Sequence, residues 1–286
     1  MVFVKTNKKN KKNMTPKIVT SFIGGEWVEP NESSHKIKII HPADEQHIST
    51  LYEADTNEVS NAAETAKKTF DSGVWSNASV DDRKSVLLAI KDLIIENKEE
   101  IAEQEVMNTG APIAQAYGRQ IPRSAMNFEF FAEFISQASS PVFDQNPDYI
   151  TYVRREPIGV AGLIAPWNAP MALATMKIAG AIAFGNSCIL KPSELTPLGF
   201  VPFMNLLKKA GLPDGVINMV NGRGSVTGTA ITQNKNIDVI AFTGGTETGR
   251  VIGAESGKTL KKIVTELGGK SANIIFSDAD FERALD

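Results

Sequence analysis

The stretch 155–194 constrains the fold more than any other part of the sequence. Its apolar run Gly159–Ile164 is typical of a strand that is buried on both faces. A helix is predicted from Pro170 to a stop at Gly185, because proline suits a first helical turn and glycine ends helices. A second buried strand is predicted over 187–191. Strand, helix and strand in this order predict a βαβ unit with parallel strands.

The same alternation continues towards the end of the chain. Further helices are predicted over 196–211, 224–233 and 246–256, and further strands over 216–220, 237–242, 263–264 and 272–276. Repeated alternation of this kind predicts a doubly wound parallel sheet with helices on both faces. Such sheets bind ligands at the carboxyl ends of their strands, so functional side chains are expected in the loops that follow the strands.

The first half of the chain predicts short strands and then helices. A hairpin over 22–28 would turn at Gly24–Gly25, and two more strands are expected over 37–40 and 48–52. Asp55 and Ser79 are each placed to cap a helix, with helices expected over 55–70, 79–94, 99–108 and 113–136. The aromatic side chains of the last helix are interpreted as core or interface packing.

Composition excludes several classes of protein. The formal charge is −3 and 42% of residues are hydrophobic, so neither nucleic acid nor an acidic membrane is expected as a partner. No apolar run approaches the roughly 18 residues that span a membrane. The one cysteine, Cys188, excludes an intramolecular disulfide and indicates a cytoplasmic location. The three histidines lack metal-ligand spacing, so no metal site is expected.

Residues 1–17 form a basic opening without the apolar centre of a signal peptide. We expect a disordered, solvated tail there. Both Met1 and Met14 are open as the start of the protein.

Polar side chains follow both strands of the βαβ unit. Asn168 lies in the loop after the first strand, where its amide could donate a hydrogen bond to a developing oxyanion. An ordinary turn asparagine is the alternative. Lys191 and Glu194 follow the second strand, and a solvated strand end is the alternative for both.

Taken together, these residues carry a family resemblance. Pro166-Trp167-Asn168, then Lys177, then Lys191-Pro192-Ser193-Glu194 resemble the central signature of the NAD(P)-dependent aldehyde dehydrogenase superfamily. The segment 265–271, which contains Glu266, resembles the second catalytic signature of that family. The resemblance implies an α/β fold: a Rossmann-like doubly wound parallel sheet of the aldehyde dehydrogenase type, with N-terminal helices and a bridging β-hairpin. It also implies oxidation of an aldehyde by NAD and water to a carboxylic acid and NADH.

The resemblance implies a role for each catalytic candidate. Asn168 would hold the oxyanion, Glu266 would act as the general base that activates water, and Lys177 would support both. An exposed glutamate before a turn is the alternative for Glu266. The family's nucleophilic cysteine lies beyond the position of Glu266, and Cys188 is interpreted as a small core residue. We therefore expect a truncated chain that does not oxidise aldehydes by itself.

Cofactor binding is expected along the loops that follow the strands. The segment 242–249 resembles the pyrophosphate-contacting turn of the family, with Gly245 where the family commonly has serine. The GxGxxxG run 222–228 is weaker support. Glu194 would accept from the ribose hydroxyls and repel a 2′-phosphate, which favours NAD over NADP. The expected cofactor-binding residues are Ile164, Ala165, Pro166, Trp167, Lys191, Ser193, Glu194, Gly224, Phe242, Thr243, Gly244, Gly245, Thr246, Gly249, Leu267 and Gly268.

The resemblance also divides the chain. An NAD-binding domain is expected over 18–138 and 158–266, a bridging and oligomerisation hairpin over 139–157, and the start of a truncated catalytic domain over 267–286. The full-length form would be a homo-oligomer, a dimer or a tetramer, acting on an aldehyde. One alternative is an inactive NAD-binding or oligomer-forming remnant. Another is a relative that makes acyl-CoA or reduces acyl phosphates, which would need no water-activating base at Glu266.

Overall fold

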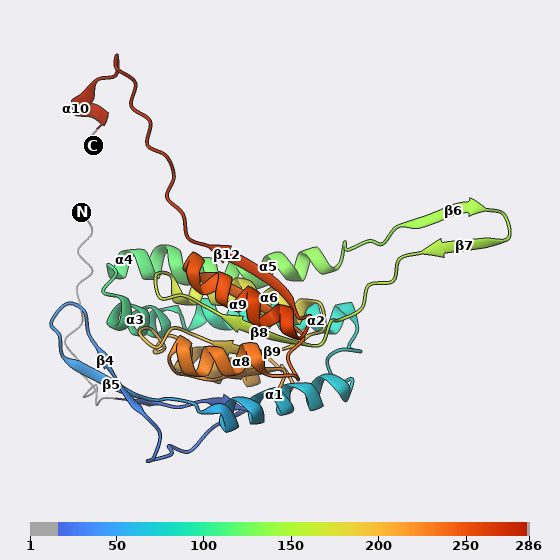
Figure 1. Ribbon diagram of the computed structural model, residues 1–286, viewed down its shortest axis with the longest axis horizontal. Coiled ribbons are helices and arrows are strands. Elements are labelled where there is room, and N and C mark those ends of the chain that lie inside the picture. The colour runs from blue at the N-terminus through green and yellow to red at the C-terminus, as the bar shows by residue number, and fades with distance from the viewer. Residues whose placement is uncertain (1–16, 285–286) are drawn as a thin grey trace.

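The structure is a computed structural model that describes residues 17–284. Its main sheet has the strand order β12-β11-β8-β9-β10-β2-β3 (Figure 1). The strands are β2 Phe22–Ile23, β3 Glu26–Trp27, β8 Val160–Ile164, β9 Ser187–Lys191, β10 Ile217–Met219, β11 Val239–Gly244 and β12 Lys262–Leu267. Strands β8 to β12 are parallel, and the β2-β3 hairpin adds antiparallel strands beside β10.

The chain winds outwards from β8 in both directions. It runs β8, β9, β10 towards one edge, then returns across the sheet to β11 and β12 beside the other side of β8. The direction therefore reverses between β8 and β11, which is where open α/β sheets form a ligand crevice. The predicted doubly wound parallel sheet is confirmed.

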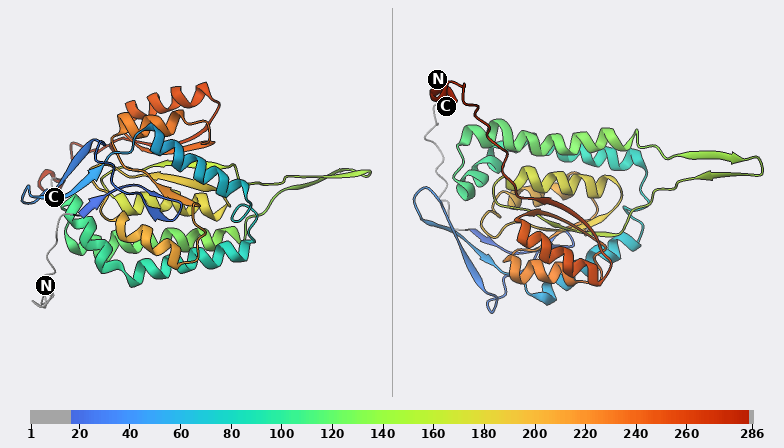
Figure 2. Two further views of the ribbon diagram at one scale, coloured as in Figure 1. Left: turned by 90° about the horizontal axis from the view of Figure 1, so that it is seen from below. Right: turned by 45° about the horizontal axis from the view of Figure 1, so that its top comes forward.

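Helices cover both faces of the sheet, as Figure 2 shows. One face carries α1 Thr56–Asp71, α8 Thr229–Gln233 and α9 Thr246–Lys258. The other carries α2 Val80–Glu96, α3 Lys98–Thr109, α5 Ile121–Ile135, α6 Pro170–Ala183 and α7 Phe200–Lys209. Alternate apolar residues of β8 and β9 point into these two cores, which explains why both strands are buried throughout.

Local signals in the sequence position several of these elements as predicted. Gly24 and Gly25 both have positive φ, as a two-residue hairpin turn requires. The Asp55 side chain accepts from the Glu58 N–H at the start of α1, and Ser79 accepts from the Asp82 N–H at the start of α2. Gly110 ends α3 in the left-handed conformation.

Other expectations need correction. The single helix expected over 113–136 is α4 Ile113–Gln115, a π-helical turn η1 over Ala116–Gln120, and then α5. A second π-turn, η2 Gly224–Gly228, precedes α8. Helix α7 begins at Phe200 rather than at 196, after a turn. The expected strand 272–276 is irregular, because a strand needs a neighbour to pair with and this segment has none among the described residues.

A second, three-stranded sheet lies beside the main body. It has the order β1-β5-β4, with β1 Lys17–Val19, β4 Lys36–Ile40 and β5 His47–Tyr52. Strand β1 takes Lys17 out of the expected tail. The rest of that tail, 1–16, lies outside the described residues.

Two segments extend away from the body. The hairpin of β6 Val142–Asn146 and β7 Tyr149–Tyr152 projects as a separate two-stranded sheet (Figure 1). After β12 the chain leaves the body and reaches the short helix α10, Phe281–Ala284. Apolar side chains are exposed on both, including Tyr149, Ile150, Ile274 and Phe276. Of residues 17–284, none belongs to a helix both long and apolar enough to cross a membrane.

Candidate functional site

The carboxyl ends of the parallel strands bring most of the predicted site residues to one edge. Ile164 at the end of β8 pairs with Lys191 of β9 on one side and with Phe242 of β11 on the other. One residue further along, Thr243 of β11 pairs with Glu266 of β12. Residues from four strands therefore stand in register along this edge, as expected from their positions after the predicted strands.

Lys177 and Glu266 line one groove on the α6 side of the sheet. Its volume is about 300 Å³, and its other walls include Leu163, Met176 and Phe242. The Lys177 amine donates to the Thr243 hydroxyl. Burial lowers the pKa of Lys177, and the nearby Glu266 carboxylate opposes that shift. The groove thus sets one amine and one carboxylate against apolar walls.

Asn168 belongs to the same edge but to a more open position. It lies in the loop between β8 and α6 and is exposed, as is Trp167 beside it. It does not belong to the residues that line the groove of Lys177 and Glu266. The structure therefore brings Lys177 and Glu266 together and leaves Asn168 outside their groove, in the exposed loop between β8 and α6, which we call the entrance loop.

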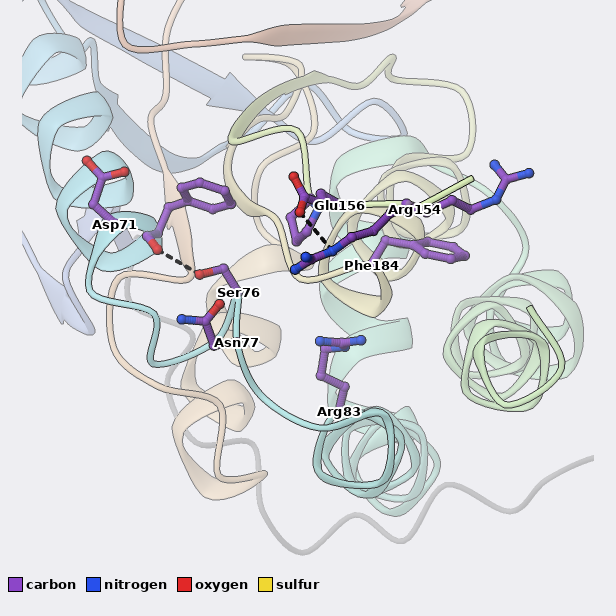
Figure 3. Close-up of a pocket in the computed structure, with 10 residues that line it drawn as sticks. Asp71, Ser76, Asn77, Arg83, Arg154, Glu156 and Phe184 are labelled. Carbon is purple, nitrogen blue, oxygen red and sulfur yellow. Dashed lines mark hydrogen bonds and ion pairs between the residues drawn. The ribbon is translucent and has the colours of Figure 1, made fainter. Parts of the chain in front are cut away.

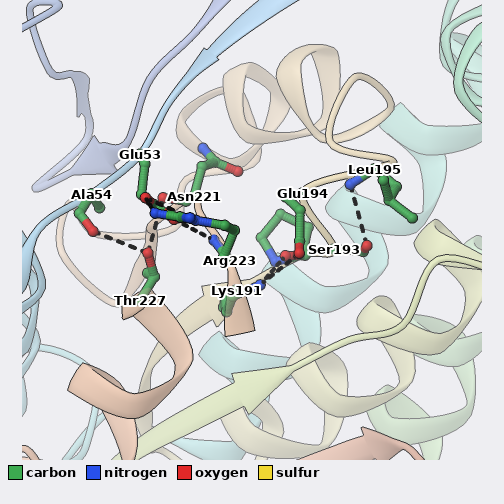
Figure 4. Close-up of polar contacts among 10 residues, drawn as sticks. Glu53, Ala54, Lys191, Ser193, Glu194, Leu195, Asn221, Arg223 and Thr227 are labelled. Carbon is green, nitrogen blue, oxygen red and sulfur yellow. Dashed lines mark hydrogen bonds and ion pairs between the residues drawn. The ribbon is translucent and has the colours of Figure 1, made fainter. Parts of the chain in front are cut away.

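The end of β9 is buried and charged. Lys191 is 2% exposed, and its amine donates to the Pro192 carbonyl at 2.9 Å and reaches Glu194 Oε2 at 3.5 Å (Figure 4). Burial lowers the pKa of Lys191, although the Glu194 and Glu53 carboxylates oppose it. The Glu194 side chain is 28% exposed, so one carboxylate at this edge is open to a ligand.

The glycine turn after β11 meets the start of α9. Gly244 ends the strand, Gly245 caps the helix in an extended conformation, and α9 begins at Thr246. The first amides of a helix have no partner within the helix and favour an anion. A Cβ at Gly249 would lie 2.5 Å from Leu267 Cδ2, so this glycine lets α9 approach β12. Gly245 faces open space, so no close contact demands a glycine there.

Sequence reasoning missed two residues that border this edge. Glu53, just after β5, and Arg223, just after β10, form an ion pair with Nη2 and Oε2 2.6 Å apart. Figure 4 shows Arg223 between Glu53 and the pair of Lys191 and Glu194. Arg223 stands inside the glycine motif 222–228, yet that motif drew attention only for its glycines. No local signal links it to Glu53, because the two are 170 residues apart.

Cys188 lies in the middle of β9 and is fully buried. Burial raises the pKa of its thiol far above the ordinary value. A thiol of this kind is inert, because the thiolate is the reactive form. The interpretation of Cys188 as a core residue agrees with this placement.

A larger cavity, about 620 Å³, lies at the opposite end of the strands (Figure 3). Arg83, Arg154, Glu156 and Phe184 are among the residues that line it, and Arg154 Nε lies 3.0 Å from Glu156 Oε1. None of the predicted site residues belongs to its walls. Pro157 in its lining precedes β8, so this cavity opens at the amino ends of the strands, where sheets of this type do not bind their ligands.

Comparison with known proteins gives consistent results. The family model described as "Aldehyde dehydrogenase family" matches residues 27–286. "Aldehyde dehydrogenase 1" of Tanacetum cinerariifolium is 41% identical over 271 residues, which is 94% of this chain and 54% of that protein. "Betaine aldehyde dehydrogenase" of Bacillus subtilis is 39% identical over 272 residues, which is 93% of this chain and 54% of that protein.

Solved structures agree with these sequence matches. The NAD+ complex of an aldehyde dehydrogenase from Bacillus cereus has a TM-score of 0.88 and 36% identity, over 93% of this chain and 54% of that one. The structure "P. syringae AldA Indole-3-Acetaldehyde Dehydrogenase C302A mutant in complex with NAD+ and IAA" has a TM-score of 0.88 and 33% identity, over 93% of this chain and 54% of that one. The chain thus spans about half the length of the curated relatives it matches.

Proposed function

This chain belongs to the aldehyde dehydrogenase family, and we propose that it carries the NAD site and part of the catalytic apparatus for oxidising an aldehyde to a carboxylic acid. The observation that carries the proposal is the register of the sheet edge, which places Lys191 on one side of the switch point and Thr243 and Glu266 on the other, all at the carboxyl ends of the strands. The resemblance of the signatures is independent of that geometry, because it rests on sequence alone.

The residues at this edge fit a dinucleotide. The partly exposed Glu194 carboxylate can accept from ribose hydroxyls, and buried Lys191 holds it in place at 3.5 Å. The amides at the start of α9, after Gly244 and Gly245, suit a pyrophosphate. The remaining contacts proposed are those of Ile164–Trp167, Ser193, Gly224, Phe242, Thr243, Thr246, Gly249, Leu267 and Gly268. When bound, NAD supplies the acceptor for the hydride.

Each catalytic candidate has a chemical task that its position supports. The Asn168 amide, exposed in the entrance loop, donates to the oxygen that becomes negative when the carbonyl is attacked. The acyl group would be carried by a nucleophile that these 286 residues do not supply. Glu266 would take a proton from water, so that the water oxygen bonds to the acyl carbon and displaces that nucleophile. Lys177 lines the same groove as Glu266, where its ammonium can stabilise the carboxylate, and the Glu266 charge in turn opposes the lowering of the Lys177 pKa by burial. A base at this position favours the acid-forming branch of the family over the acyl-CoA-forming one.

A second candidate function follows from Cys188. Within these 286 residues it is the one cysteine, and it is buried in β9 with a raised pKa. The chain by itself therefore offers no thiolate for attack on an aldehyde. The alternative to catalysis is a role in which the chain binds NAD or assembles with other copies of itself. Its cysteine usage favours the reducing cytoplasm in either case.

Binding and turnover, measured on the same preparation, separate the two functions. Calorimetric titration of the purified chain with NAD is expected to give one site per chain, and NADP is expected to bind more weakly. Addition of a simple aliphatic aldehyde with NAD is expected to produce no NADH above the blank, since no reactive thiol is present. Absence of NAD binding would contradict the proposed cofactor site. NADH production would contradict the interpretation of Cys188.

We also propose that the β6-β7 hairpin mediates a homo-oligomer, a dimer or a tetramer. All its apolar side chains are exposed, and an isolated two-stranded hairpin is barely stable in water. Light scattering on the full chain should show an assembly that Tyr149→Ser with Ile150→Ser dissociates. Matched changes at exposed Val74 and Ile95, away from the hairpin, should leave it intact. A monomer at micromolar concentration would argue against the hairpin as an interface.

A further inference from the structure

The ion pair between Glu53 and Arg223 borders the proposed ribose site and serves none of the functions described so far. Two nitrogens of the Arg223 guanidinium donate hydrogen bonds to the Glu53 carboxylate. Its Nε donates to Glu53 Oε1 at 3.0 Å, and its Nη2 donates to Oε2 at 2.6 Å. The Arg223 backbone N–H also donates to Oε1 at 2.7 Å. Three donors from one residue therefore converge on a single carboxylate, which is a strong, oriented contact.

Burial and backbone hydrogen bonds hold Glu53 in position to pair with Arg223. It is 5% exposed, its own N–H donates to the His35 carbonyl, and the next residue, Ala54, donates to the Asn221 carbonyl. The hydrogen bonds that Arg223 donates to Glu53 lower the pKa of Glu53, so the carboxylate stays charged. The carboxylate also depends on Gly222, because a Cβ there would come within 2.8 Å of Glu53 Cγ.

Arg223 lies beside the residues of the proposed ribose site. Its side chain is 45% exposed, and Figure 4 shows it next to Glu194 and Lys191. Glu194 acts on it electrostatically and adds to the rise in the pKa of Arg223, of which Glu53 is the larger cause. Two carboxylates and two cations therefore share this corner, and their charges balance.

This arrangement bears on the choice between NAD and NADP. A carboxylate recognises the ribose 2′-hydroxyl of NAD, whereas an arginine near it accommodates the 2′-phosphate of NADP. Arg223 is close enough for the second task, but its Nε and Nη2 already donate to Glu53. The bound carboxylate also cancels the positive charge that would attract a phosphate.

We propose that Glu53 is a specificity-determining, positioning residue of the dinucleotide site, which excludes NADP by holding Arg223 in an ion pair away from the 2′-phosphate. The inference rests on the proposed function, since it presumes that the ribose lies beside Glu194. It predicts that Glu194 is not the sole determinant of selectivity. Release of Arg223 alone is sufficient to admit a 2′-phosphate.

The test compares dissociation constants for NAD and NADP by calorimetry. Glu53→Gln keeps the shape of the side chain and removes its charge. NADP should bind about 10- to 100-fold more tightly to this variant, the worth of one charge-assisted contact, while NAD changes less than about threefold. The gain should vanish in Glu53→Gln with Arg223→Gln, because the phosphate then has no guanidinium to meet. Adenosine 2′,5′-bisphosphate and 5′-AMP, used as small probes, should reproduce the same contrast.

The Glu53→Asp variant guards against a folding defect in Glu53→Gln. Aspartate keeps the charge but is one methylene shorter, so it loosens the fork and should raise NADP affinity by a smaller factor, about three- to tenfold. Circular dichroism and a thermal melt identify the folded variants.

The possible outcomes separate a failure of the proposed role of Glu53 from a failure of the proposed NAD site. A wild-type protein that binds NAD, together with folded variants that keep the wild-type ratio of NADP to NAD affinity, would overturn this inference alone. Retention of the gain in the double variant would overturn it too, because Arg223 would not be the receptor. A protein that binds neither nucleotide, with or without Glu53, would overturn the proposed function and this inference with it.

Discussion

The two halves of the sheet edge differ in how completely they are built. At the β9-β10 end, Lys191 and Glu53 are buried and each charged group has a partner of opposite sign. At the β11-β12 end, Glu266 and all of β12 are exposed, and β12 pairs with β11 alone among the described strands. Both ends belong to the same register, so the difference comes from what packs on them.

This contrast separates recognition from chemistry. The proposed adenosine end is held by long-range contacts that exist before any ligand arrives, and such preorganisation favours binding. At the proposed catalytic end, β12 is held by its pairing with β11, and Lys177 and Glu266 line one groove. Substitutions at the first end should therefore affect folding or nucleotide affinity, whereas substitutions at the second should leave both nearly unchanged.

The largest effect is expected from Gly222→Ala. Gly222 has φ +149°, and a Cβ there would overlap the Thr227 hydroxyl, which donates to the Ala54 carbonyl. Strain and overpacking together should lower the free energy of unfolding by about 4 kcal/mol. Gly224→Ala is the matched control, because a Cβ at Gly224 meets no atom within 4 Å. Equal loss of stability in the two variants, measured in urea, would show that the buried end is not held by close packing.

Glu105 of α3 is expected to give the next largest effect, and one that depends on pH. It lies near the first turn of α6 and near Gly199, where an added Cβ would come 3.2 Å from Glu105 Oε2. Burial raises its pKa from 4.5 to about 7, although the Met171 N–H favours the charged form. The folded state therefore keeps a proton that the unfolded chain releases above pH 4.5.

The sign of the pH effect follows from that difference. Stability from this group is complete below the unfolded pKa and is lost as the pH rises towards 7. At about pH 8, Glu105→Gln should raise the free energy of unfolding by about 3 kcal/mol, and below pH 4.5 it should change little. Urea unfolding across this range checks the slope. A wild type whose stability does not fall between these pH values would contradict the raised pKa.

A smaller effect is expected from Glu194→Gln. The change removes the carboxylate proposed to accept from the ribose hydroxyls, so NAD affinity should fall about tenfold, or about 1.4 kcal/mol. The side chain is partly exposed, and its loss should cost little stability. Glu64→Gln, at an exposed glutamate on α1, serves as the charge-matched control. An unchanged dissociation constant for NAD would place the ribose elsewhere.

The smallest effect is expected from Glu266→Gln. Because Glu266 is exposed and makes no contact at the β9-β10 end, stability should change by less than about 0.5 kcal/mol. NAD affinity should stay within about twofold. A large loss of either, in a thermal melt or a titration, would show that the two ends are coupled after all.

Much of the fold follows from local sequence. Strand β9 coincides with the predicted 187–191, and Asp55, Ser79 and Gly110 sit at helix ends as their chemistry requires. Such features depend on side chains a few residues apart, so a sequence exposes them directly. The same holds for the loops that carry Asn168, Glu194 and Glu266, because each follows a recognisable strand. Their proposed roles still rest on family resemblance and await the experiments above.

Other features were decided only when the chain closed on itself. Glu53 and Arg223 meet because β5 of the small sheet ends beside β10 of the main sheet, a crossing that no local pattern records. The expected strand 272–276 stays irregular, because a strand is stabilised by hydrogen bonds to a neighbour rather than by its own composition. Local chemistry thus determined the strands, the helix ends and the candidate loops. The burial of Lys191, the ion pair beside it and the exposure of Glu266 depend on long-range packing, and only the tertiary structure decided them.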